Sequence, residues 1–86
     1  MTLTAQLKIH ALQSLNQMGG EPMPDTSLRA SLRIGFRHQN VTETHLNAAI
    51  RELDAEGMFI TTDEPVTGEL MRSLSARGQA AAARFA

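Results

Sequence analysis

The side chains able to do acid–base, metal or covalent chemistry are few in this chain. It has three histidines, His10, His38 and His45, and no cysteine. None of the histidines stands at the H-x-x-x-H or H-E-x-x-H spacing of a metal-binding helix, and without cysteine there is neither a thiolate ligand nor a disulfide. No phosphate-binding glycine loop and no nucleophile elbow is present. We therefore expect no metal, no other cofactor, no catalytic residues and no enzyme activity.

Arginines offer a second kind of chemistry, which is the binding of anions. Arg29, Arg33 and Arg37 are four residues apart, so they share one stripe if the segment is helical. Arg29 also stands four residues after Asp25, and an intrahelical ion pair between these two is an equally good interpretation. The candidates for contacts with phosphate groups are Arg29, Arg33, Arg37, His38 and Arg72.

The charges are distributed unevenly behind a net charge of −1. Residues 26–51 carry four arginines against one glutamate, a net charge of +3. Residues 52–69 carry six carboxylates and no basic residue, a net charge of −6. A basic surface attracts phosphate and an acidic one repels it. Binding of nucleic acid through the basic segment is thus compatible with the near-neutral total.

An apolar pattern predicts a first helix over residues 3–18. Five apolar residues recur at helical spacing: Leu3, Leu7, Ala11, Leu15 and Met18. Gly19-Gly20 then stops the pattern. Ala5, Ile9 and Leu12 lie on nearly the opposite side, and a helix that is apolar on two sides is normally covered twice. The second cover is either the C-terminal helix or another subunit, so these three residues are candidates for a dimer or partner face.

The remaining elements follow within a single domain of residues 1–86. Prolines make residues 21–24 extended, and a second helix is predicted over 25–34. Thr42 is a good N-cap and Gly57 a good C-terminal stop for a third helix over 42–56. Two strand-like runs around the turn-forming residues 63–68 predict a β-hairpin over 58–74, followed by an alanine-rich helix over 75–85.

The outward face of the third helix has side chains suited to reading DNA bases. Its inward stripe consists of Leu46, Ala49, Ile50 and Leu53. On the other side, Arg51 can bind guanine and Asn47 can pair with adenine. Thr44 and Ala48 can contact a thymine methyl group. The same residue types are also ordinary on any exposed helix.

The order of these elements, and two motifs, resemble winged helix-turn-helix domains. The run A-I-R-E-L-D-A-E-G-M-F-I at residues 49–60 looks like the end of a recognition helix and the first wing strand. The run S-L-S-A-R-G at residues 73–78 resembles the segment that leaves the wing and opens the next helix. Bacterial regulators of the multiple-antibiotic-resistance, PadR-like and ArsR-like classes share these features. The resemblance implies a mostly helical α+β fold, with a three-helix core, a two-stranded wing and a C-terminal helix.

That resemblance implies a small transcription regulator that binds double-stranded DNA, with a second copy of the chain or another protein as a further partner. The acidic wing is a departure from the usual pattern, because carboxylates repel phosphate. Two alternatives therefore stay open: a winged-helix protein-interaction module that does not bind DNA, and a phage- or plasmid-type accessory protein within a nucleoprotein assembly. The sequence has no apolar run long enough to span a membrane and no leader pattern, so a cytoplasmic location is expected.

Overall fold

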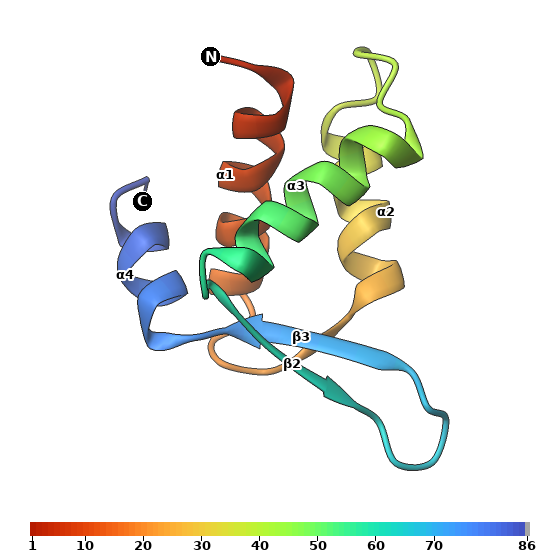
Figure 1. Ribbon diagram of the computed structural model, residues 1–86, viewed down its shortest axis with the longest axis vertical. Helices are drawn as coiled ribbons and strands as arrows, with labels where there is room; N and C mark the ends of the chain where they lie inside the picture. Colours follow the sequence, from red (N-terminus) through yellow and green to blue (C-terminus); the bar gives the residue numbers. More distant parts are fainter. Residues whose placement is uncertain (86) are drawn as a thin grey trace.

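The N-terminal helix is the element on which the other helices pack. The computed structural model describes residues 1–85, and in it α1 (Leu3–Asn16) contacts each of the other three helices. These are α2 (Asp25–Gly35), α3 (Glu43–Ala55) and α4 (Ala76–Ala83). Figure 1 shows α4 on one side of α1, with α2 and α3 on the other. About half of the chain is helical, in agreement with the predicted α+β class.

A three-stranded antiparallel sheet lies below the helices in Figure 1. Its strands are β1 (Met23–Pro24), β2 (Phe59–Asp63) and β3 (Leu70–Leu74), and their order is β1-β3-β2. The sequence indicates an extended segment at β1, but not its pairing with β3. Proline is tolerated there because β1 is an edge strand, where a missing N–H disrupts no inner ladder. The β2–β3 hairpin extends away from the helices.

Two helix boundaries show how local chemistry sets the element ends. α1 ends at Asn16, two residues before the predicted end, and a turn follows in which Gly19 and Gly20 have φ values of 61° and 96°. Met18 falls in this turn and is exposed, so it does not join the apolar face predicted for it. α3 begins after Thr42, whose Oγ1 accepts a hydrogen bond from the His45 amide at 3.4 Å. The His45 Nδ1 accepts one in return from the Thr42 amide at 3.1 Å, which completes a capping box.

The core lies between α1, α2 and α3 and is closed by the sheet and α4. Its buried apolar residues are Leu7, Ala11, Leu12, Leu15, Leu28, Leu32, Leu46, Ala49, Ile50, Leu53, Phe59, Leu74 and Ala82. The four-residue stripe predicted for α3 is fully included. Because that stripe faces the core, the opposite side of α3 is turned toward solvent.

Candidate nucleic-acid interface

Three of the four predicted base-reading residues are exposed on the outer face of α3. Thr44, Asn47 and Arg51 are exposed, whereas Ala48 is half-buried. The spacing of three and four residues between them places the three exposed side chains along one stripe. The exposed part of the predicted face is therefore the Thr44–Asn47–Arg51 stripe, and Ala48 lies at its margin.

A cavity of about 230 Å³ brings several of the predicted residues together between α2, α3 and β3. It is lined by Arg29, Asn47, Ile50, Arg51, Asp54 and Arg72. Arg51 makes no ion pair within residues 1–85, so its guanidinium keeps all its donors available in this part of the chain. The cavity is not lined by the remaining candidates, which are Thr44, Ala48, Arg33, Arg37 and His38.

Arg29 is a bridge between α2 and α3. Its Nε donates to Asp25 Oδ2 at 2.8 Å, which is the intrahelical pair that the spacing allows. Its Nη1 donates to Asn47 Oδ1 at 2.8 Å and to Glu43 Oε2 at 3.3 Å. The side chain is 21% exposed. Arg29 therefore holds the Asn47 side chain from the side of α2. Its guanidinium is largely occupied by contacts within the protein, which compete with the phosphate contact predicted for it.

Arg33 and the turn after α2 are more accessible than Arg29. Arg33 is exposed and forms an ion pair with Glu43. Because Glu43 also pairs with Arg29, one carboxylate binds two of the residues predicted to contact phosphate. Arg37 and His38 are exposed in the turn between α2 and α3, and neither forms an ion pair within residues 1–85. These two residues are the phosphate candidates with the fewest internal competitors.

Arg72, expected to contact phosphate, is instead buried. It is only 8% exposed, and its Nε donates to Asp25 Oδ1 at 2.6 Å. Its Nη1 donates to Thr61 Oγ1 at 3.2 Å, and the guanidinium lies 5.4 Å from the centre of the Phe59 ring. Withdrawing this side chain toward solvent would leave a carboxylate without its closest partner, at a substantial energetic cost. Arg72 is therefore a structural residue and is removed from the candidate interface.

Asp25 is a neighbour of the site whose contact with Arg72 was not predicted from the sequence. The contacts of Arg72 and Arg29 converge on its two carboxylate oxygens, so Asp25 links β3 to α2 and, through Arg29, to α3. Burial raises the pKa of Asp25, but the hydrogen bonds from Arg72 and Arg29 outweigh it and leave the pKa below its ordinary value. The pairing with Arg29 has a signal in the sequence, whereas Arg72 is 47 residues away and has none.

The hairpin beside this interface carries carboxylates. Glu64 Oε2 accepts hydrogen bonds from the amides of Thr67 at 2.6 Å and Val66 at 3.0 Å, and these bonds lower the pKa of Glu64. Glu64 thus shapes the turn, with Asp63 and Glu69 close to it in the sequence and both exposed. The acidic hairpin expected from the sequence is present and remains unfavourable for phosphate.

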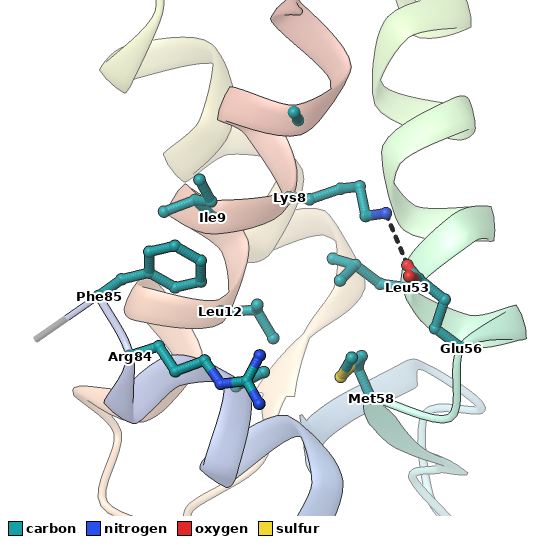
Figure 2. Close-up of a pocket in the computed structure, with 10 residues that line it drawn as sticks. Lys8, Ile9, Leu12, Leu53, Glu56, Met58, Arg84 and Phe85 are labelled. Atoms are coloured by element: carbon teal, nitrogen blue, oxygen red, sulfur yellow. Dashed lines mark ion pairs between the residues drawn. The ribbon is translucent and has the colours of Figure 1, made fainter. Parts of the chain in front are cut away.

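The face of α1 predicted for a dimer or partner is partly covered by α4. Ala5 and Ile9 are half-buried, and Leu12 is 4% exposed. All three line a groove of about 300 Å³ between α1 and α4, part of which is drawn in Figure 2. Leu12 is therefore a core residue of the single chain, and Ala5 and Ile9 keep some surface for another molecule.

Metal sites, membrane spans and relatives give no further guide to function. Within residues 1–85, no group of three or more histidine, aspartate or glutamate side chains is placed to hold a metal ion. In the same part of the chain, each helix is too short or too polar to cross a bilayer. Comparisons of the chain with protein-family models, with curated proteins and with solved structures found no match. The geometry of the residues described above is therefore the basis for assigning a function.

Proposed function

We propose that this protein is a winged helix-turn-helix DNA-binding protein that acts as a transcription regulator. In this proposal α2 and α3 are the helix-turn-helix, β2 and β3 are the wing, and α3 enters the major groove. The observation that carries the proposal is the exposed Thr44–Asn47–Arg51 stripe, which lies opposite the buried stripe of α3. A helix that reads a major groove must present such a face, with its N-terminal half near the base edges.

The two longer side chains of the stripe have the hydrogen-bonding groups that base recognition needs. Asn47 Oδ1 accepts from Arg29 but retains a second lone pair, and both amide N–H donors remain. A side-chain amide oriented in this way can bind the N6 and N7 edge of adenine, and Arg51 can bind O6 and N7 of guanine. Arg29 then acts behind the interface, because it limits the rotation of the Asn47 side chain.

Two of the three carboxylates of α3, Glu43 and Glu52, form ion pairs within the protein, which supports the approach of phosphate. Glu43 pairs with Arg29 and Arg33, and Glu52 and Glu56 pair with Lys8 of α1. Arg37 then supplies positive charge at the turn before α3, and His38 beside it offers ring nitrogens for hydrogen bonds. A phosphate group that reaches Arg33 must compete with Glu43. Glu43 therefore lowers the affinity for DNA that Arg33 would otherwise provide.

The decisive experiment measures binding of a mixed-sequence duplex by fluorescence anisotropy at about 50 and 200 mM salt, where phosphate binding weakens steeply. We expect the wild type to bind the duplex at about 50 mM salt and to bind it much more weakly at about 200 mM salt. The Arg37→Ala/Arg51→Ala variant should bind more weakly, with a salt slope reduced by about one unit for each phosphate group that the variant no longer binds. Arg77→Ala removes an exposed arginine of α4 and is the matched control, with unchanged binding expected.

Glu43→Gln supplies a change in the opposite direction. It removes the charge that competes for Arg29 and Arg33, so affinity at low salt should rise and the salt slope should steepen. Absence of binding by the wild type at low salt would contradict the proposal and favour the alternative of a protein-interaction module. Equal binding by wild type and the double arginine variant would show that the α3 face is not the interface.

A further inference from the structure

One edge of the sheet, along β2, is unpaired in the part of the chain that the structure describes. In the strand order β1-β3-β2, the two outer strands are β1 and β2, and β2 pairs with β3 along its whole length of five residues. Figure 1 shows β2 leaving the end of α3 and running out along the hairpin, away from the helices. The far side of β2 is therefore open to another extended segment, and we call it the free edge.

The hydrogen bonds at the two ends of the hairpin show which backbone groups face the free edge. The Ser75 amide donates to the Met58 carbonyl oxygen at 3.0 Å, and the Glu64 amide donates to the Glu69 carbonyl oxygen at 2.8 Å. Both pairs continue the register between β2 and β3. Hydrogen-bonded pairs alternate along an antiparallel ladder, so the even-numbered residues of β2 bond to β3. The free edge therefore presents the N–H and C=O groups of the odd-numbered residues, which are Phe59, Thr61 and Asp63.

The sequence of β2 favours the pairing of its free edge. Residues 59–63 contain neither lysine nor proline, the residues that commonly protect an edge strand, and their register with β3 is regular. Ile60, Thr61 and Thr62 are β-branched, which suits an extended backbone. Thr61 and Asp63 are exposed, and Ile60 on the other face of the sheet is 51% exposed. An extended peptide can therefore reach both the free backbone groups and an apolar side chain.

The charge of the hairpin selects the kind of peptide. Asp63 ends β2, Glu64 follows it, and Glu69 lies opposite Glu64. Among residues 1–85, these three carboxylates make no ion pair. A peptide that carries lysine or arginine is attracted to this end of the strand, whereas DNA, an acidic peptide or the same hairpin of a second copy is repelled. The charge thus favours a basic extended segment.

We propose that the free edge of β2 binds an extended, basic segment of another protein as an additional antiparallel strand. In this arrangement Thr61 and Asp63 each exchange two backbone hydrogen bonds with the residue opposite. Alternate residues of a strand share a face, so basic side chains of the segment lie beside Asp63 and apolar ones lie beside Ile60. The proposal goes beyond DNA binding and does not depend on it, because the outer face of α3 takes no part.

Amide hydrogen exchange of the full chain, followed by NMR, tests the proposal. The probe is a capped peptide of alternating lysine and valine, about eight residues long, which is within the usual length of a strand. With the peptide at up to about 1 mM, exchange at the Thr61 and Asp63 amides should slow about tenfold or more, whereas Ile60 and Thr62 are already protected by the ladder. A peptide of alternating glutamate and valine is the control and should have no effect.

Three results would overturn the proposal. The first is no binding of the lysine peptide, and the second is binding without slower exchange at Thr61 and Asp63. The third is slower exchange at these two amides as the concentration of the protein alone is raised, which would show that a second copy occupies the free edge.

N-methylated peptides separate backbone pairing from attraction between charges. The peptide residues opposite Thr61 and Asp63 present their own N–H groups to β2, and these residues are the lysines when lysine lies beside Asp63. Methylation of the lysine amides should weaken binding about tenfold or more, because the donors to β2 are lost, and methylation of the valine amides should change it by less than about twofold. The two peptides have the same charge, so equal affinities would refute strand addition.

Thr61→Pro makes the corresponding change in the protein. It removes an N–H group that faces the free edge and none that bonds to β3, so peptide binding should weaken while the hairpin is retained. Thr61→Val also lacks the hydroxyl group but keeps the N–H group, and it is the matched control, with unchanged binding expected. Equal binding by the two folded variants would contradict the proposal. The methylated peptides with the wild type decide the question if circular dichroism shows that Thr61→Pro is unfolded.

Discussion

Asp25 is the residue at which the polar contacts of three elements converge. Its carboxylate accepts hydrogen bonds from Arg29 of the same helix and from Arg72 of β3. Arg29 also donates a hydrogen bond to Asn47 on α3. These groups are largely withdrawn from water, with side-chain exposures of 15% for Asp25 and 10% for Arg72. A partly buried charge that loses its partner is destabilising, so removal of this one carboxylate affects both arginines.

Asp25→Asn should lower the free energy of unfolding by about 1–3 kcal/mol at neutral pH, because two arginines lose their common charged acceptor. The pKa of Asp25 is lowered in the folded protein, so the unfolded chain binds the proton at higher pH. The stabilisation is thus fully present above the ordinary value of 3.8 and is lost as pH falls through the folded pKa. Urea unfolding at neutral and successively lower pH should show the difference between wild type and variant disappearing in acid.

The exposed Asp54 provides the control for this measurement. It forms no ion pair within residues 1–85, so Asp54→Asn should change stability by less than about 0.5 kcal/mol. An equal loss of stability in Asp25→Asn and Asp54→Asn would mean that the net charge of the protein, and not the contacts of Asp25, causes the effect.

At the scale of elements, the junction between the hairpin and α4 depends on Ser75 and Gly78. Ser75 Oγ donates to the Gly57 carbonyl oxygen at 2.6 Å and accepts from the Gly78 amide at 3.1 Å, which caps α4. Gly78 is buried, and a Cβ atom there would overlap the carbonyl oxygen of Met58. The first turn of α4 thus lies directly against the chain that enters β2.

Gly78→Ala should destabilise the protein by about 2 kcal/mol or more, because inserted atoms meet backbone that has little freedom to move. The sign of this change in stability is informative, since a glycine-to-alanine substitution in an exposed helix stabilises the protein by about 1 kcal/mol. Thermal unfolding followed by circular dichroism measures it, with Gln79→Ala at the neighbouring exposed position as the control. An unchanged or higher midpoint for Gly78→Ala would show that α4 does not pack this closely.

At the scale of the whole molecule, the uneven charge distribution makes the proposed DNA binding one-sided. Arg37, His38 and Arg51 lie on or near the α2–α3 surface, whereas the hairpin carries carboxylates. Figure 1 shows that the hairpin projects beyond the helices, so its charges act at the edge of any duplex held by α3. Repulsion at that edge then limits affinity in low salt.

Asp63→Asn with Glu69→Gln should therefore raise the affinity for duplex DNA severalfold at about 50 mM salt, with a smaller gain at higher salt because the repulsion is screened. Glu64 is left unchanged, since it accepts the two amide hydrogen bonds of the turn. Anisotropy titrations at several salt concentrations provide the measurement, and Glu21→Gln is a neutralising control at an exposed position before β1. A gain that does not depend on salt would contradict an electrostatic cause.

The sequence by itself determined the elements whose signals are local. Helical spacing of apolar residues, the Thr42 and Ser75 caps and the turn around residues 63–68 each act within a few residues, so α3, α4 and the hairpin were predictable. The exposed stripe of α3 was predictable for the same reason, since a buried stripe defines its opposite face. Even the pair between Arg29 and Asp25 is visible as a spacing of four residues.

Only the tertiary structure decided which charged groups remain available. Arg72 reaches Asp25 across 47 residues, and Lys8 reaches Glu52 and Glu56 across more than forty, so no local pattern reveals that these charges are used internally. The pairing of β1 with β3 and the covering of Leu12 by α4 depend on the same long-range packing. A count of charges along the sequence does not distinguish a buried arginine from an exposed one. Folding separates the buried Arg72 from the exposed Arg37 and Arg51, because burial of a charge is tolerated only where an opposite charge is already in place.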